Sequence, residues 1–238
     1  GEFVVTKEVQ FIDSGHDQYA CRSKGTNTPV FKFEKLSMGF ESAQWFYFGI
    51  DGNGTASQSQ GTYYIGSGGF AWTNSAPGKF CLGGIWDGDV ATIRPWHSDF
   101  TIGTRGDDAE DIVFMYSCVL CTDDESGKGR TITIDGKTRF RNNSASIAIN
   151  GSGKVRLNSM AHSTSVARPV TVGGTATLAI KPGAGFGESS MTVGSNATLE
   201  VPESGIVESV GATTFADGAK LAFNFTDATS APCIEFKG

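Results

Sequence analysis

Acidic side chains gather in the first half of this chain, and they are the residues best suited to catalysis. They form three groups, which are Asp87 with Asp89, residues 107–111 and residues 123–125. Two carboxylates that flank a sugar bond can hydrolyse it, and a base assisted by calcium can cleave an acidic polysaccharide. The simpler interpretation is that the three groups are solvated loops, because short acidic runs usually face water.

Tryptophan and histidine side chains accompany the acidic groups and suggest contact with a carbohydrate. An indole ring offers a flat surface on which a sugar can stack, although most aromatic side chains pack in a core instead. No serine or cysteine motif accompanies the histidines, so the sequence predicts no nucleophilic triad and no catalytic residue. The candidate carbohydrate-binding residues are Trp45, Trp72, Trp86, Trp96, Asp87, Asp89 and His97.

Two of the five cysteines, Cys118 and Cys121, have the CxxC spacing of redox and zinc sites. A redox CxxC stands at the start of a helix, and a zinc site needs a second pair, but neither context is present. Residues three apart in a strand point to opposite faces, so a bond between these two thiols would need a bend. Buried thiols are the first expectation, a disulfide that includes Cys118 or Cys121 the second, and a metal site the third.

Residues 51–55 place oxygen-bearing side chains at alternate positions, as calcium-binding loops do. The glutamate that would complete an EF-hand loop is missing, because Thr62 occupies its position. A solvated turn is the simpler interpretation, since Asp, Asn and Gly dominate turns. The sequence therefore predicts neither a metal nor a cofactor.

The elements that must position these side chains are short strands, and they are most regular in residues 170–223. Three phrases align there, with Leu178 recurring as Leu199 after 21 residues (199 − 178) and as Leu221 after 22 more (221 − 199). Each phrase is an alternating strand, a Gly-containing turn and a second alternating strand. A period near 20 built of strands and turns indicates a β-solenoid, in which each repeat is one coil.

The repeats predict an all-β fold, a single-stranded right-handed parallel β-helix with about 21–22 residues per coil and almost no α-helix. The length of the chain then allows about eleven coils. Alternation in residues 175–180 puts Ala176, Leu178 and Ile180 inside and Ala179 outside, because successive side chains of a strand point to opposite faces.

The two halves of the chain differ in character. Residues 1–130 are irregular and rich in aromatic side chains, whereas residues 131–238 are regular and rich in Gly, Thr and Ala. No Pro- or Ser-rich linker separates them, so we predict one β-helix domain over residues 1–238. The open ends of such a helix need covering, and the first segment could serve as a cap.

Composition excludes several classes of function. The net charge is −6 and the isoelectric point is near 5.1, without a cluster of Lys and Arg, so nucleic acid is not an expected partner. The apolar fraction of 39 % is too high for a disordered chain. No apolar run approaches the roughly 18–20 residues that a membrane-spanning helix needs.

The phrases TVGGTATL (residues 171–178) and TVGSNATL (residues 192–199) resemble the autotransporter-associated β-strand repeats of bacterial surface proteins. Residues 65–70, with the sequence IGSGGF, are similar to a phrase found upstream of such repeats in large secreted proteins. The resemblance is good over residues 130–223 and loose over residues 45–106. It implies a right-handed parallel β-helix of the pectin-lyase-like architecture in a surface-exposed or secreted, mainly non-enzymatic and often adhesive protein, and it supplies no catalytic motif.

The functional expectation is a secreted or cell-surface structural or adhesive repeat module of a bacterium, without catalysis. The alternative is a carbohydrate-active β-helix that binds or cleaves a polysaccharide with the aromatic and acidic first half. A third hypothesis is a calcium-dependent wall module. The expected partners are a polysaccharide, the extracellular matrix or a cell-surface glycan.

Overall fold

The computed structural model consists of β-strands, and no helix occurs in the residues that it describes. The near absence of helix predicted from the sequence is therefore confirmed for this part of the chain. The structure describes residues 1–12, 18–20, 28–39, 45–50, 60–73, 79–84, 88–103, 112–114, 116–135, 138–140, 146–158, 168–186, 189–201, 207–209, 211–223 and 234–236.

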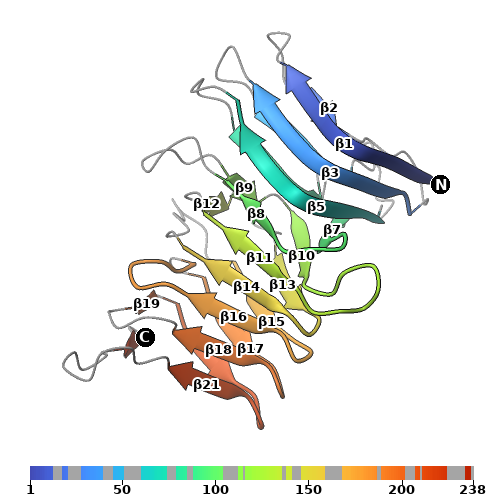
Figure 1. The fold of residues 1–238 in the computed structure, drawn as a ribbon. Helices are drawn as coiled ribbons and strands as arrows, with labels where there is room; N and C mark the ends of the chain where they lie inside the picture. Colours follow the sequence, from blue (N-terminus) through green and yellow to red (C-terminus); the bar gives the residue numbers. More distant parts are fainter. Residues whose placement is uncertain are drawn as a thin grey trace.

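One continuous parallel sheet winds along the molecule, with β1 at one end and β21 at the other (Figure 1). Its first three strands are long and bend midway, so that each contributes to two faces; they are β1 (Glu2–Ile12), β3 (Val30–Gly39) and β5 (Gln60–Trp72). The bend is evident in β5, whose first half pairs with β7 and whose Phe70 pairs with Ile102 of β8. We call the two faces A and B and the bend between them corner AB.

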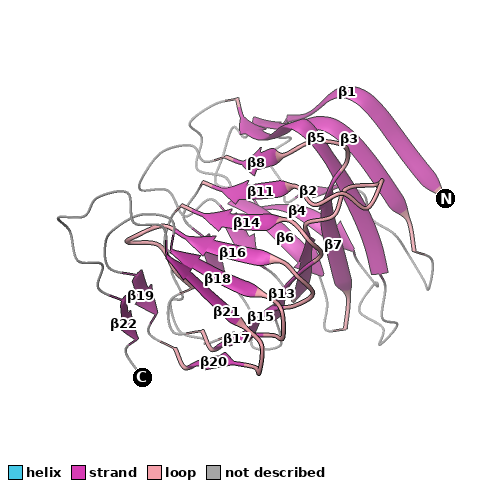
Figure 2. Ribbon diagram, turned by 60° about the horizontal axis from the view of Figure 1, so that its bottom comes forward, coloured by secondary structure: helices cyan, strands magenta, loops and turns pink. Residues whose placement is uncertain are grey.

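After β5 each coil uses separate strands for the two faces (Figure 2). Face A continues through β7 (Val90–Pro95), β10 (Ser117–Cys121), β13 (Ser146–Asn150), β15 (Val170–Val172), β17 (Met191–Val193) and β20 (Thr213–Phe215). Face B continues through β8 (Phe100–Ile102), β11 (Thr131–Ile134), β14 (Lys154–Leu157), β16 (Thr177–Ile180), β18 (Thr198–Val201) and β21 (Lys220–Phe223).

A third set of parallel strands, face C, completes the early coils. Five strands stack in it, namely β2 (Gln18–Ala20), β4 (Trp45–Ile50), β6 (Lys79–Gly84), β9 (Ile112–Phe114) and β12 (Thr138–Phe140). Near the end of the chain, β19 (Val207–Ser209) pairs in parallel with β22 (Ile234–Phe236). The chain thus passes from face A to face B and then to face C, and the fold is the predicted parallel β-helix.

The core consists of ladders in which equivalent inward side chains of successive coils stack on one another. Most inner members of such a ladder are buried, as Ile93 and Val172 are, whereas its end members Phe3 and Phe215 are 54 % and 38 % exposed. Among the described strands, each end member pairs with a neighbour on one side only. The longest ladder on face A comprises Phe3, Phe31, Tyr63, Ile93, Leu120, Ile149, Val172, Val193 and Phe215.

The inward face predicted for residues 175–180 is confirmed, and one outward residue differs. Ala176, Leu178 and Ile180 are buried as expected. Ala179 points outward but is also buried, so its predicted exposure is wrong. In the sheet it lies between Arg156 and Glu200, whose long side chains leave little solvent contact for a methyl group.

The predicted coil length holds for the last coils and fails for the first ones. Val170 pairs with Met191, which is 21 residues on (191 − 170), whereas Val30 pairs with Thr62, which is 32 residues on (62 − 30). Consequently nine strands stack on face A within the described residues, against about eleven predicted coils. The early coils are longer because they carry strands of 10 to 13 residues, such as β3 and β5, and longer connections.

Glycine is required at corner AB where neighbouring coils touch through their main chains, and this predicts a strong effect of substitution at Gly153. A Cβ atom there would lie 2.1 Å from the carbonyl oxygen and 2.4 Å from the amide nitrogen of Arg130. The coils would have to separate, so we expect Gly153→Ala to lower the free energy of unfolding by about 1–3 kcal/mol. Urea unfolding followed by tryptophan fluorescence measures the change.

The matched control is Gly173→Ala, at the same corner in the next coil. A Cβ atom at Gly173 would meet nothing closer than the carbonyl oxygen of Ile149 at 4.0 Å. This variant is expected to stay within about 1 kcal/mol of the wild type, because its corner has room for a methyl group. Equal losses in the two variants would show that main-chain contact does not explain the glycine at position 153.

Candidate functional site

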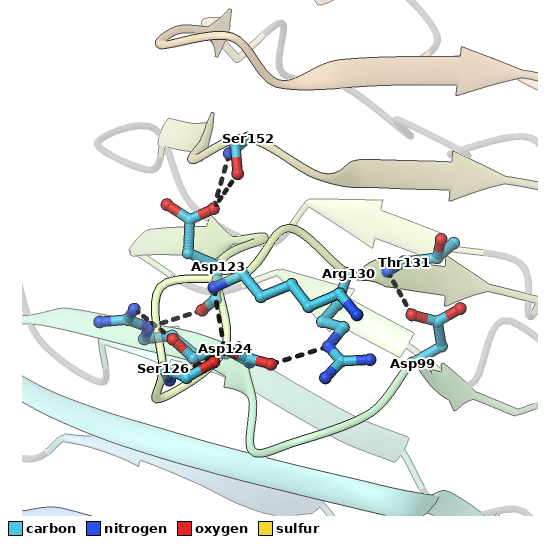
Figure 3. Close-up of polar contacts among 9 residues, drawn as sticks. Asp99, Asp123, Asp124, Ser126, Arg130, Thr131 and Ser152 are labelled. Atoms are coloured by element: carbon cyan, nitrogen blue, oxygen red, sulfur yellow. Dashed lines mark hydrogen bonds and ion pairs between the residues drawn. The ribbon is translucent and has the colours of Figure 1, made fainter.

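The most elaborate polar structure of the described chain is the loop of residues 122–130, which joins β10 to β11 at corner AB. Asp124 holds this loop together from within (Figure 3). Its Oδ1 accepts hydrogen bonds from the Ser126 amide at 2.8 Å, the Ser126 hydroxyl at 2.6 Å and the Lys128 amide at 3.0 Å. Its Oδ2 accepts a bond from Arg130 Nε at 2.7 Å. The carboxylate therefore closes the loop as a structural cap.

These bonds fix the charge of Asp124. The Ser126 hydroxyl, the Arg130 guanidinium and the two main-chain amides together hold the pKa of its carboxyl group well below its usual range. They outweigh the opposing effect of burial, since Asp124 is only 1 % exposed. A carboxyl group that stays ionised at every physiological pH cannot donate a proton, so Asp124 is unsuited to act as a general acid.

Asp123 connects the loop to the following coil. Its Oδ1 accepts bonds from the amide and the hydroxyl of Ser152, at 2.8 and 2.6 Å (Figure 3). The Gly153 amide donates in the same way to the Thr122 hydroxyl at 2.8 Å. These contacts hold corner AB of one coil against that of the next.

The loop also folds back over earlier coils. The guanidinium of Arg94, on β7, donates to the main-chain oxygens of Asp123 and Asp124 at 3.0 and 3.1 Å. Glu125 accepts a bond from Trp96 Nε1 at 2.9 Å and forms an ion pair with Lys32 on β3. The Lys32 ion pair and then the Trp96 bond lower the pKa of Glu125, so this carboxylate is also ionised at neutral pH.

Aromatic rings lie beside these charges on the outer surface. The Tyr64 ring has Lys32 Nζ 5.6 Å and Arg94 Cζ 5.2 Å from its centroid, within the range of cation–π attraction. The Trp96 and His97 rings have centroids 5.1 Å apart. His97 is 54 % exposed, and its Nε2 lies 3.3 Å from Glu34 Oε2. We call Lys32, Glu34, Tyr64, Arg94, Trp96, His97 and Glu125 the corner cluster.

Two shallow hollows adjoin one another on the outer surface of face B, next to corner AB. Their volumes are about 320 and 340 Å³, and Asp99 and Thr131 line both of them. The Thr131 amide donates to Asp99 Oδ1 at 2.9 Å (Figure 3). The other polar side chains are Ser67, Thr101, Thr133 and Arg156 in the first hollow and Arg130, Ser152, Lys154 and Thr177 in the second.

The structure brings together two of the predicted carbohydrate-binding residues, Trp96 and His97, and disperses the others that it describes. Trp72 packs against the core at the end of β5, and its Nε1 donates to the Gly103 carbonyl oxygen at 3.2 Å. Asp89 is 1 % exposed, so it contributes to packing and not to an outer binding surface.

Several predicted site residues lie in the part of the chain that the structure does not describe. Trp86, Asp87, the acidic run 107–111 and the loop 51–55 lie outside the described residues, as do Cys21 and Cys233. The main chain of Trp45 belongs to β4, but its side chain is outside the described part of the structure.

The disulfide considered for Cys118 and Cys121 is not formed, because both thiols are free. The two positions have opposite orientations in β10, as expected for residues three apart: Cys118 is buried and Cys121 is partly exposed. Burial raises the pKa of Cys118 to about 12, so it is a thiol at neutral pH and unsuited to nucleophilic attack or metal binding.

No protein family model, curated protein or solved structure matches this chain. Within the described ranges, no group of three or more His, Cys, Asp or Glu side chains is placed to hold a metal ion. The same part of the chain contains no helix that is long and apolar enough to cross a membrane.

No sequence signal pointed to the Lys32, Glu34 and Tyr64 side chains of the corner cluster or to the cationic side chains of face B. Lys32 and Glu125 are 93 residues apart, and no local motif connects them. The repeat does not single out Arg156, because the equivalent outward position holds Ala179 in the next coil and the charged Glu200 in the coil after that.

Proposed function

We propose that this protein is a non-catalytic β-helical module that is secreted or displayed on a bacterial surface and acts through its outer face as a structural or adhesive element. The observation that carries the proposal is the state of the acidic loop. Asp123, Asp124 and Glu125, which form the best-described acidic run, all accept structural hydrogen bonds. Catalysis by paired carboxylates needs one of them to be protonated at working pH, and hydrogen bonds lower the pKa values of the Asp124 and Glu125 carboxyl groups.

The shape of the outer surface supports the same proposal. The hollows on face B are shallow and polar, whereas small-molecule sites are usually enclosed and largely apolar. Such a surface suits many weak contacts with an extended partner, each of which adds little affinity by itself. The resemblance of residues 171–178 and 192–199 to repeats of bacterial surface proteins supports an extracellular location.

The second candidate, a carbohydrate-active β-helix, has support from the corner cluster. Trp96 is partly exposed beside His97, and the His97 ring contacts the Glu34 carboxylate. An exposed aromatic ring next to polar groups suits sugar binding. Because the nearby Glu125 is ionised and bonded to Trp96, the cluster favours binding over cleavage.

A parallel test of catalysis and attachment distinguishes the two candidates. We expect the full chain to release no reducing ends and no unsaturated products from a panel of neutral and acidic polysaccharides, with or without calcium. We expect coated beads that carry the chain to bind polysaccharide-coated or bacterial surfaces more than beads coated with the heat-denatured chain. Product release in proportion to protein concentration would refute the proposal, and so would equal attachment of native and denatured chains.

A further inference from the structure

We propose that the two adjoining hollows on face B form one binding site for an acidic polysaccharide, with the Arg156 guanidinium as its principal anion-binding group. This inference rests on the proposed function, because it names the ligand of a module that binds without cleaving. It concerns a surface to which the sequence assigned no role.

The two hollows are continuous with one another. The hollows share Asp99 and Thr131, so they form a single depression that extends over neighbouring coils. On face B it covers β8, β11, β14 and β16, which are consecutive in the sheet, and Ser67 at the bend of β5 borders it. Neighbouring strands are spaced by about 4.8 Å, so the depression spans roughly 15 Å and suits a ligand of several units.

The lining of the depression is polar. Two outward rows cross the depression, one with Thr131, Lys154 and Thr177 and the other with Thr133 and Arg156. Hydroxyl groups both donate and accept hydrogen bonds, as sugar hydroxyl groups do. The side chains that line the hollows thus offer hydrogen bonds and charge but few apolar contacts. A protein partner would require an apolar interface core, which this surface lacks.

The cationic side chains of the depression differ in their partners. Asp124 binds Arg130 through a 2.7 Å contact, and Glu200 binds Lys154 through a 2.8 Å contact. Arg156 differs, because no ion pair or hydrogen bond engages its side chain among the residues that the structure describes. A guanidinium without a partner, beside threonine hydroxyl groups, is suited to a carboxylate or sulfate group, which it can bind through two parallel hydrogen bonds.

A general attraction to polyanions is excluded by the net charge of the chain, which is −6, so its overall field repels an anionic polymer. Binding of such a polymer must therefore be local, at a cation that no carboxylate engages. Asp124 and Glu200 engage Arg130 and Lys154 at the rim, which leaves Arg156 as the lining cation with no ion pair among the described residues.

The test uses three polymers with one backbone, namely dextran, carboxymethyl-dextran and dextran sulfate. We expect the full chain to bind both anionic polymers and to bind neutral dextran at least about tenfold more weakly, because the neutral polymer cannot form charge-assisted hydrogen bonds with Arg156. Comparison of the carboxylated and sulfated polymers shows which anion the site prefers. Binding should weaken as sodium chloride rises, since salt screens exposed charges.

Substitution locates the site. Arg156→Gln is expected to weaken binding of the preferred anionic polymer at least about tenfold, and Arg156→Lys, which keeps the charge, less than that. The matched control is Lys7→Gln, which removes one exposed positive charge from β1, outside the hollows. The control is expected to bind like the wild type. Thermal melting checks that the variants are folded.

The outcomes separate this inference from the proposed function. The proposed site would be refuted if the chain bound neutral and anionic dextrans equally, or if it bound neither anionic polymer. It would also be refuted if Arg156→Gln and Lys7→Gln lost the same amount of binding. Attachment to bacterial surfaces that persists in any of these cases would leave the proposed function standing. Cleavage of a polysaccharide would instead overturn the proposed function, even with Arg156-dependent binding.

Discussion

Replacing Leu178 by alanine is expected to lower the free energy of unfolding by about 2–5 kcal/mol, the range for a fully buried leucine that leaves a cavity. Leu178 lies on face B between Val155 and Leu199 of the neighbouring coils, and all three side chains are buried. A β-helix transmits its stability from coil to coil through such contacts, so a cavity in one inner coil weakens both of its interfaces. Urea unfolding measures the loss.

The same substitution at the end of the same ladder provides the control. Leu221 occupies the position equivalent to Leu178 two coils later, where it pairs with Leu199 and is 40 % exposed. Because only one coil covers it, Leu221→Ala is expected to cost about 1 kcal/mol or less. An equal loss of stability in Leu221→Ala and Leu178→Ala would show that another part of the protein covers the last coil. Position in the ladder would then not explain the expected difference between the two variants.

The ladder explains why so much of the fold could be predicted from the sequence. Alternation in residues 175–180 specifies which side chains face inward, and recurrence of Leu178 as Leu199 and Leu221 specifies the stacking of coils. Both are local or periodic signals. Neither specifies how long a coil must be, because the interior constrains the strands and leaves the connections free. The 21-residue step from Val170 to Met191 therefore could not reveal the 32-residue step from Val30 to Thr62.

The candidate site was far less predictable for a related reason. The acidic loop was visible as a run of charges at Asp123 to Glu125, and solvation was the simpler interpretation. Its carboxylates instead accept specific bonds from Ser126, Ser152 and Trp96, two of which belong to other coils. Contacts between coils depend on register, and register follows from coil lengths that the sequence does not reveal in the irregular half. Trp96 and His97 were found only because their types suggested chemistry.

Replacing Asp124 by asparagine is expected to remove about 1–3 kcal/mol of stability at pH 7, as the loss of hydrogen bonds to a buried charge does. Asparagine can still accept bonds from Ser126 and Lys128, but it cannot balance the charge of Arg130. The matched control is Asp217→Asn, which removes an exposed carboxylate from the turn between β20 and β21 and is expected to change stability by less than about 0.5 kcal/mol. Chemical unfolding at pH 7 compares the three proteins.

The effect of Asp124 should also depend on pH, with a sign that follows from its lowered pKa. The pKa of an unfolded aspartate is about 3.9, whereas Ser126 and Arg130 keep that of folded Asp124 well below this value. Between the two pKa values the unfolded chain binds more protons, so acid favours unfolding. The stability that Asp124 contributes is thus complete above about pH 5 and is lost progressively as the pH falls through 4 and below.

The difference in stability between the wild type and Asp124→Asn is therefore expected to shrink from pH 5 to pH 2.5. Glu8 and Glu125, whose pKa values are also lowered by hydrogen bonds, make the wild type and the variant equally sensitive to acid and cancel in this difference. A difference that stays constant over this range would mean that the contribution of Asp124 to stability does not depend on the charge of its carboxyl group. A difference that shrinks would establish the ionised carboxylate as the group that closes the loop, which is the state that excludes Asp124 as a general acid.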